Sequence, residues 1–412
     1  MPLKKKQNIL YFIFFLSLLV SLYFKENSSG GSKLDSILTN HFIEYFQIGL
    51  LEGINYFIES AQVHSPIFYI IVAKIKSLFG DQISAVIYII ISSTLPFLFY
   101  DLLKKKFVNA DKNYLFFLSL LIFLSPYFRS SASWLTNDNF AMIFFCLSLK
   151  YFLDIKNKKD SIAKNYYLSF IFLSLSAYIK QYFGIFIIIY IYELIKEKNL
   201  SLFVNCIFLN LILALPFFIY SYNLYLEHNL IFKSHNSYNV SMIDNFVFIF
   251  SIFFFYFLPF IISIKFEIKN TKLYIYKKLK LILLILIFTI PIFFFNDLND
   301  LEFGGGVIYK ITEKFIYFKN LIFAVVFALT FIFLILLFNK NPKNYLIVFL
   351  LCLISFDFVF QKYYDPLLLI VFFTLIDSEK ITTLVNSQAF RLKIIYLFYF
   401  IFLVSANFYY YN

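Results

Sequence analysis

The chain has 412 residues, of which 61% are apolar and only 15% are charged, and its mean hydropathy is +0.78. Soluble domains carry about 45–50% apolar and about 25% charged residues, so the composition excludes an ordinary soluble protein. In a soluble protein the net charge of +12 would suggest nucleic-acid binding. In a polytopic membrane protein the lysines instead mark the side on which each loop lies, so we expect a lipid bilayer and no nucleic acid as partner.

Cysteines and histidines argue against a metal or redox centre. The three cysteines, Cys146, Cys206 and Cys352, all lie within apolar runs. An odd number of cysteines in such segments is not typical of a disulfide framework or a metal cluster. The external histidines and carboxylates also lack convincing metal-ligand spacing. We therefore expect no metal and no cofactor.

Apolar runs long enough to cross a bilayer, which takes about 17–25 residues, recur along the chain. Clear candidates lie near 8–24, 83–103, 202–222, 246–264, 279–295, 319–338, 345–360 and 393–409. Shorter candidates lie near 114–128, 140–155, 165–179, 183–196 and 366–377. Together they predict an all-α polytopic membrane protein with about 13 spans.

Lysine clusters fix the direction of the first spans, because cytoplasmic loops carry the excess of Lys and Arg. The clusters at 4–6 and 104–106 are both expected inside, so an even number of crossings separates them. The runs 8–24 and 83–103 supply two crossings, and 66–79 is predicted to lie at the outer interface. Alternation of the spans then places the N-terminus on the cytoplasmic side of a plasma (bacterial inner) membrane. About two-thirds of the Lys and Arg residues fall on that side.

The first apolar run could be a signal peptide, but no small-x-small cleavage site follows it, which favours an uncleaved anchor. We expect a single transmembrane domain over 1–412. It would consist of a first external loop at 25–82, further spans over 83–377 and a C-terminal span within 378–412.

The external segments carry the groups that can do chemistry. All four histidines and more than half of the carboxylates fall on this side, so we expect the site at the outer face. In the first external loop, helical periodicity predicts one interfacial helix over about 36–52, with Gly53 as a stop. A second is predicted over 66–79, where Pro66 suits the first helical turn.

Three further stretches are candidates for a binding site, and each has a structural alternative. Asp138 is expected at the start of a helix, where it would either cap that helix or contact substrate. Lys180 and Gln181 follow a short run and would either line a wet cavity or snorkel to the surface. Lys362 and Tyr363 belong to an outward turn that is either an aromatic belt or part of the site.

Taken in order, four stretches resemble the GT-C superfamily of membrane glycosyltransferases, over roughly 8–377. The superfamily includes protein O-mannosyltransferases, lipid A aminoarabinose transferases and the late N-glycan precursor transferases that use dolichyl-phosphate sugars. HSPIFYIIVAKIKSLFG is similar to the family's His-Pro-Pro-Leu-Tyr-Tyr stretch, and WLTNDNFAMIFF to its Thr-x-Asp-x-x-Ala entry to the fourth span. AYIKQYFGIF resembles the Lys/Arg-Gln stretch between spans five and six, and KYYDP the late Arg-Tyr-x-x-Pro.

The resemblance implies transfer of a sugar from a polyprenyl-phosphate donor to a glycan, lipid or protein acceptor. A carboxylate would take the acceptor proton, and cations would hold the phosphate. The candidate residues are Asp35 and Glu44 as catalytic base; Arg129, Lys180 and Lys362 as phosphate ligands; and His64, Asp138, Asn139, Gln181 and Tyr363 as groups that bind the acceptor or shape the site.

One departure from the family concerns the base. Family members carry an acidic pair early in the first external loop, but Thr39-Asn40 occupies the expected place here. Asp35 upstream is favoured over Glu44 downstream. A transporter or flippase, or a polysaccharide polymerase or ligase of another fold, remains the alternative. A transporter should show inverted repeats, and none is evident.

Overall fold

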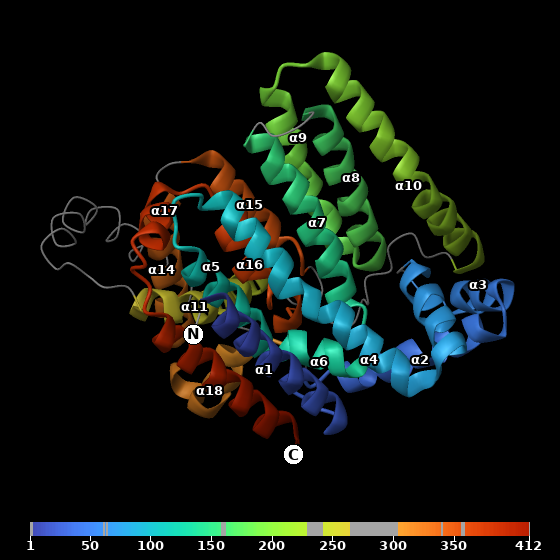
Figure 1. The fold of residues 1–412 in the computed structure, drawn as a ribbon, viewed down its shortest axis with the longest axis horizontal. Helices are drawn as coiled ribbons and strands as arrows, with labels where there is room; N and C mark the ends of the chain where they lie inside the picture. The colour runs from blue at the N-terminus through green and yellow to red at the C-terminus, as the bar shows by residue number, and fades with distance from the viewer. Residues whose placement is uncertain are drawn as a thin grey trace, which may run out of the picture. The chain divides into compact units, whose positions relative to one another are not determined.

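The computed structural model describes residues 3–60, 62, 65–157, 162–228, 242–263, 304–338, 341–355 and 359–411. Over these residues the regular elements are helices, in agreement with the predicted all-α class (Figure 1). The chain forms two compact units. Unit 1 comprises Met1–Val108, Lys112–Lys233 and Tyr399–Asn412, and unit 2 comprises Asn109–Asp111 and Ser234–Phe398.

Unit 1 holds the first half of the chain. Its helices are α1 (Leu3–Tyr23), α2 (Ser32–Ile48), α3 (Leu50–Glu59), α4 (Ile67–Lys106), α5 (Lys112–Ser119), η1 (Leu120–Leu124), α6 (Pro126–Trp134), α7 (Asp138–Lys156), α8 (Ile162–Ile179), η2 (Gln181–Phe186), α9 (Ile187–Lys196) and α10 (Leu200–His228). The C-terminal part of α18 (Leu392–Tyr411) also belongs to unit 1.

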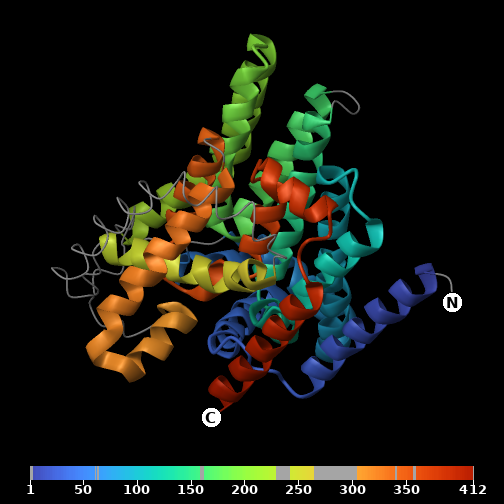
Figure 2. The same ribbon diagram turned by 90° about the vertical axis from the view of Figure 1, so that its left-hand side faces the viewer.

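Unit 2 is built mainly on α11, which α14 crosses; both are visible in Figure 2, in yellow and orange. Its helices are α11 (Met242–Ser263), α13 (Gly306–Thr312), η3 (Glu313–Phe318), α14 (Lys319–Phe338), α15 (Pro342–Cys352), η4 (Gln361–Tyr363), α16 (Leu367–Thr374), α17 (Glu379–Asn386) and the first part of α18.

Five of the described helices are long and apolar enough to cross a membrane, or six if one bent pair counts as a single span. The five are Ile67–Lys106, Leu200–Asn223, Asp244–Ser263, Lys319–Phe338 and Leu392–Tyr410. This agrees with a multi-pass membrane protein. The predicted run at 279–295 lies outside the described residues, and the full count of about 13 spans is not reached among the described helices.

The second predicted interfacial helix and the span that follows it are the two helical segments of α4, which meet at a kink at Gly80. This glycine has φ 75° and ψ 171°, a conformation essentially restricted to glycine. The break falls between the predicted segments 66–79 and 83–103. The sequence therefore indicated two segments correctly but not that they join end to end.

The first predicted interfacial helix is two helices, because the chain breaks at Gly49 rather than stopping at Gly53. Gly49 is extended (φ −176°, ψ 162°) between α2 and α3. Gly53 lies inside α3 and is buried; a Cβ there would stand 2.2 Å from the Phe46 ring. The expectation of Gly53 as a helix stop was wrong, since this glycine allows α3 to approach α2 closely.

The chain turns sharply between η1 and α6. The segments Lys112–Leu124 and Pro126–Trp134 are bent by 61° relative to each other. The Ser125 hydroxyl accepts a hydrogen bond from the Phe128 N–H at 3.1 Å, and Pro126 occupies the first turn, so the local sequence begins a new helix here. As a result α6, with its serines and Arg129, is buried within unit 1.

Helices α4, α7 and α8 pack together in the interior of unit 1. The predicted break after 165–179 is confirmed, because α8 ends at Ile179 and Lys180 is extended before the 3₁₀ turn η2. An irregular backbone of this kind is tolerated at membrane depth only inside protein or beside a wet cavity. The break brings the end of α8 to the beginning of α7, where the polar groups described next converge.

Candidate functional site

An ion pair between Lys180 and Asp138 marks the candidate site. The Lys180 Nζ lies 2.9 Å from the Asp138 Oδ1, and the two side chains are only 10% and 20% exposed. Asn137, and not Asp138, is the N-cap of α7, and no side chain caps that helix end. Asp138 is therefore not the cap; it lies in the first turn of α7, where its charge suits the helix dipole, and it also pairs with Lys180.

Asp35 belongs to the same corner. It lies in the first turn of α2, a helix that contacts α4. The charges of Asp35 and Asp138 both act on the Tyr69 hydroxyl of α4. Two acids predicted from separate loops thus act on one tyrosine, and Lys180 pairs with one of them.

The loop before α4 borders the end of α8. The Ser65 backbone N–H donates to the Tyr178 carbonyl at 3.2 Å, two residues before Lys180. The Tyr220 hydroxyl of α10 donates to the Gln62 carbonyl. The His-Ser-Pro motif therefore leads into the corner that contains Lys180; His64 itself lies outside the described residues.

Thr136 bonds Asp138 directly, and Tyr88 bonds Thr136. The Thr136 hydroxyl lies 3.0 Å from the Asp138 Oδ2 and 2.9 Å from the Ser131 hydroxyl. The Thr136 carbonyl accepts a hydrogen bond from the Tyr88 hydroxyl. These contacts fix the carboxylate of Asp138 on a frame shared by α4, α6 and α7.

Asn139 and Gln181, both predicted site residues, have different environments. Asn139 is buried; its side-chain amide donates to the Phe128 carbonyl at 2.9 Å and its backbone N–H to the Ser131 hydroxyl at 3.3 Å. It therefore holds α7 against α6. Gln181 is exposed in the first position of η2, next to Lys180.

The sequence analysis missed Lys76 as a partner of the first external loop. Its Nζ lies 2.9 Å from the Asn40 side-chain oxygen and 3.1 Å from Asp81, and its side chain is 12% exposed. Lys76 thereby ties α4 to α2. The sequence suggested only a cation at the interface, because nothing in its spacing identifies Asn40 as a partner.

Arg129, predicted to bind phosphate, forms a buried ion pair with Glu26. Its Nε and one terminal nitrogen contact the Glu26 carboxylate at 2.8–3.1 Å. The remaining N–H groups donate to the Ser17 hydroxyl, the Ser17 carbonyl and the Phe123 carbonyl. All five N–H donors thus have protein acceptors, and in this arrangement Arg129 joins α6 to the chain that follows α1.

Glu26 was absent from the predicted site, and its environment is well defined. Burial favours the neutral acid, but the charge and hydrogen bonds of Arg129 outweigh it, helped by Ser21 and Ser28, so the pKa of Glu26 is lowered. The Trp134 indole also donates to the Glu26 carbonyl at 2.7 Å. Only the tertiary contact between distant segments reveals this pair.

The alternative base, Glu44, lies elsewhere on α2. It follows Asp35 by two and a half helical turns, which places it on the opposite side of the helix. Its side chain is 69% exposed, with the His41 ring nitrogen 3.8 Å away. The two candidate bases therefore do not share one site, and Asp35 is the one that faces Tyr69.

Lys362 and Tyr363 lie in η4 of unit 2. The Lys362 Nζ stands 5.5 Å from the centre of the Phe360 ring and 5.8 Å from that of Tyr363. The neighbouring Gln361 is buried and bonds the Tyr256 hydroxyl and the Val307 N–H. The role of Lys362 as a phosphate ligand stays a prediction, as does that of Tyr363.

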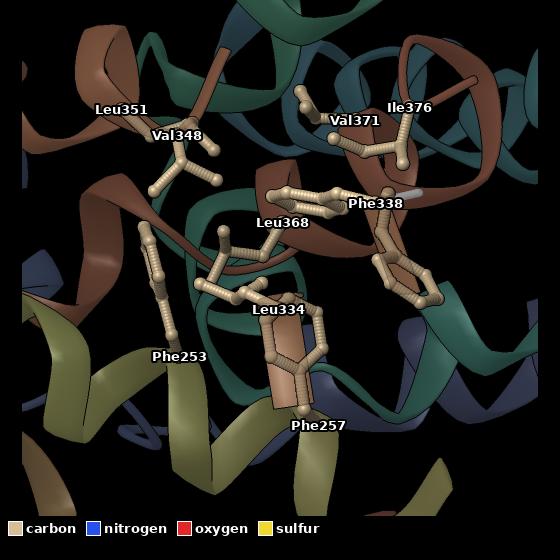
Figure 3. Close-up of a pocket in the computed structure, with 10 residues that line it drawn as sticks. Phe253, Phe257, Leu334, Phe338, Val348, Leu351, Leu368, Val371 and Ile376 are labelled. Carbon is tan, nitrogen blue, oxygen red and sulfur yellow. The ribbon is translucent and has the colours of Figure 1, made fainter. Parts of the chain in front are cut away.

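Unit 2 also contains a small apolar pocket between α11, α14, α15 and α16, shown in Figure 3. Its lining is Phe253, Phe257, Leu334, Phe338, Val348, Leu351, Leu368, Val371, Phe372 and Ile376. None of these side chains can donate a proton or bind an anion, so the pocket offers packing space rather than chemistry.

Comparisons with known proteins do not extend this description. No family model, no curated protein and no solved structure matches the chain. Among the described residues no group of three or more His, Cys, Asp or Glu side chains is placed to hold a metal ion.

Proposed function

We propose that the chain is an integral membrane glycosyltransferase of the GT-C type, which transfers a sugar from a polyprenyl-phosphate donor to a glycan, lipid or protein acceptor. The observation that carries the proposal is the corner of unit 1 where Lys180 pairs with Asp138 and where the charges of Asp35 and Asp138 both act on Tyr69. Such a transfer needs a carboxylate as the base and a cation to stabilise the leaving phosphate, both in a site largely shielded from water.

In the proposed reaction the acceptor hydroxyl attacks the anomeric carbon of the donor sugar. Asp35 takes the hydroxyl proton, while the bond between the anomeric carbon and the phosphate oxygen breaks. The polyprenyl phosphate leaves with an additional negative charge, which the Lys180 ammonium stabilises. Asp138 holds Lys180 in place through the 2.9 Å ion pair, and an ammonium can contact a phosphate oxygen with another of its three N–H donors.

The proposal includes the topology expected from the sequence. About 13 spans would cross a plasma membrane, with the N-terminus in the cytoplasm and the site at the outer face. The lysine clusters at 4–6 and 104–106 support this orientation. A lipid-linked phosphate would then lie at the headgroup level, close to the first external loop.

The test is sugar transfer in proteoliposomes that contain the purified full chain and a series of polyprenyl-phosphate hexoses. Wild-type protein should transfer sugar, and Asp35→Asn should reduce the rate by about 10²–10⁴-fold, the range for loss of a general base. Glu44→Gln removes the other first-loop acid from the opposite side of α2 and should keep most of the rate.

Two results would contradict the proposal in different ways. Normal transfer by Asp35→Asn would reject Asp35 as the base while keeping the enzyme class. No transfer from any lipid-linked donor, together with solute uptake by the same vesicles, would favour the transporter alternative. The bent pair of α5–η1 and α6 and the break at Lys180 support that alternative, since broken helices are common in transporters.

A further inference from the structure

The first half of helix α2 exposes large apolar residues and buries small polar ones. Leu34, Ile37 and Leu38 are 65%, 59% and 62% exposed, whereas Ser32 and Ser36 are buried. In a soluble protein the opposite distribution is expected, because burial of apolar surface drives folding. The inversion indicates that the medium outside this part of α2 is apolar.

The exposed side chains of α2 separate into two faces. Positions repeating every three or four residues lie on one side of a helix. The apolar face consists of Leu34, Ile37, Leu38, Tyr45 and Ile48, and the polar face of Lys33, Glu44 and Gln47. His41 lies between the apolar residues, and its ring nitrogen is 3.8 Å from Glu44. A third side packs on the protein through Phe42, Ile43 and Phe46.

The apolar face continues past the break at Gly49. Leu50 and Leu51, at the start of α3, are 56% and 71% exposed and follow Ile48, which is 73% exposed. Figure 1 shows α2 and α3 adjacent to α4 in unit 1. Several large apolar side chains on two consecutive helices thus form one surface. Such a surface needs an explanation, whereas single exposed apolar residues do not.

We propose that this apolar face of α2 and α3 is embedded in one leaflet of the bilayer, with α2 lying along the membrane surface. A helix in that position needs one side toward lipid, one toward water and, in a larger protein, one toward the rest of the chain. The three sides of α2 match these surroundings. The sequence predicted an interfacial helix, and the structure adds which residues enter the lipid.

The commitment to lipid rather than to a second copy of the chain rests on two observations. The chain has several apolar helices of spanning length, so a bilayer must surround it. The apolar face also adjoins a charged face on the same short helix, as at a boundary between lipid and water. The proposal does not depend on the glycosyltransferase assignment.

The test uses the single tryptophan of the chain. In a Trp134→Phe background, Leu38→Trp and Gln47→Trp place one fluorophore on each exposed side of α2, half a turn apart around the helix. In proteoliposomes, lipids brominated near the headgroup end of their chains should quench Leu38→Trp strongly and Gln47→Trp weakly. Aqueous acrylamide should show the reverse order. Ile212→Trp, on the exposed apolar side of α10, should be quenched best by lipids brominated near the chain end.

Trp134 donates a hydrogen bond to Glu26, so a second measurement keeps that residue unchanged. Leu38→Cys and Gln47→Cys can be labelled with a water-soluble maleimide, since the natural cysteines are buried. Cysteine at 47 should react faster than at 38 in a bilayer. Three results would overturn the proposal. Acrylamide could quench Leu38→Trp, the two cysteines could be labelled equally, or position 38 could be shielded from both quenchers. The last result would indicate a protein partner on this face.

Discussion

Unit 1 contains two buried acid–base pairs that look alike in the sequence and differ in the structure. Glu26 with Arg129 is closed, because every N–H of the guanidinium has a protein acceptor and the carboxylate also bonds Ser21. Asp138 and Lys180 meet in one 2.9 Å contact, the Thr136 hydroxyl also bonds Asp138, and Asp138 is the more exposed partner at 20%. The comparison separates a pair that holds helices together from a pair that can receive a ligand.

The physical reason is hydrogen-bond capacity. A buried charge is tolerated when its polar atoms are satisfied, and a fully satisfied guanidinium has nothing left to offer a phosphate. An ammonium with one ion-pair contact retains donors for a second anion. The number of satisfied donors, and not the presence of a cation in an external loop, identifies the candidate ligand.

The largest loss of folding stability is expected when the fully hydrogen-bonded pair of Glu26 and Arg129 is broken. Arg129→Ala leaves Glu26 charged and buried without its partner, a change that typically costs about 3–5 kcal/mol of folding stability. Thermal unfolding of the purified protein in detergent measures this loss. Lys180→Ala should cost less, because Asp138 keeps its hydrogen bond from the Thr136 hydroxyl and its side chain is 20% exposed, against 10% for Glu26. Equal losses for the two variants would show that the pairs do not differ.

For sugar-transfer activity we expect the reverse order, with a larger loss when Lys180 is replaced than when Arg129 is replaced. Lys180→Met should lower kcat/KM for sugar transfer by about 10²–10³-fold, the usual effect of losing one preorganised charge at a developing anion. Lys180→Arg, which keeps the charge, should recover part of the rate. The readout is transfer in proteoliposomes at matched protein stability. An unchanged kcat/KM in Lys180→Met would remove Lys180 from the site.

A smaller effect is expected from the support of the open pair. Thr136→Val keeps the shape of the side chain but removes the hydroxyl that bonds Asp138 and Ser131. Hydrogen bonds to charged groups contribute about 1.5–3 kcal/mol, so we expect a loss of folding stability in the lower part of this range. Thr136→Ser, which restores the hydroxyl, is the matched control, and its unfolding temperature should lie close to that of wild type.

The two pairs should also differ in their dependence on pH. Because Arg129 lowers the pKa of Glu26 below the ordinary value of 4.5, the ionised pair stabilises the fold above that value. The stabilisation should be lost as pH falls through the lowered folded-state pKa. Unfolding temperatures between neutral and acidic pH measure this slope. Glu26→Gln should flatten it in the acidic range, and a slope as steep as that of wild type would assign the acid sensitivity to other carboxylates.

Several features of the fold were predictable because they depend on local sequence. The break at Lys180 followed from two apolar runs too short to span a bilayer. The start of α6 at Ser125-Pro126 was not predicted, since it falls inside the apolar run expected over 114–128. The place of Gly53 was not predictable, because a glycine that ends a helix and one that lets two helices approach look the same in sequence. The position of α3 against Phe46 decides between them.

The candidate site shows the same division. Asp35, Asp138 and Lys180 were selected because they lie in or near stretches that resemble the GT-C superfamily and because sugar transfer needs a base and a cation. Glu26 and Lys76 were missed, because their partners Arg129 and Asn40 lie far away in the sequence. The sequence favoured Asp35 over Glu44, and the turn of α2 adds that the two lie on opposite sides of the helix.

The sequence by itself determined the helical class, the membrane as solvent and the side chains available for chemistry, because apolar excess and periodicity act locally and along the chain. Only the tertiary structure decided which charges meet, which donors are already satisfied and which face of α2 is left exposed. Ion pairing and burial depend on distances in space, and residues 103 positions apart, such as Glu26 and Arg129, become neighbours only when the helices pack.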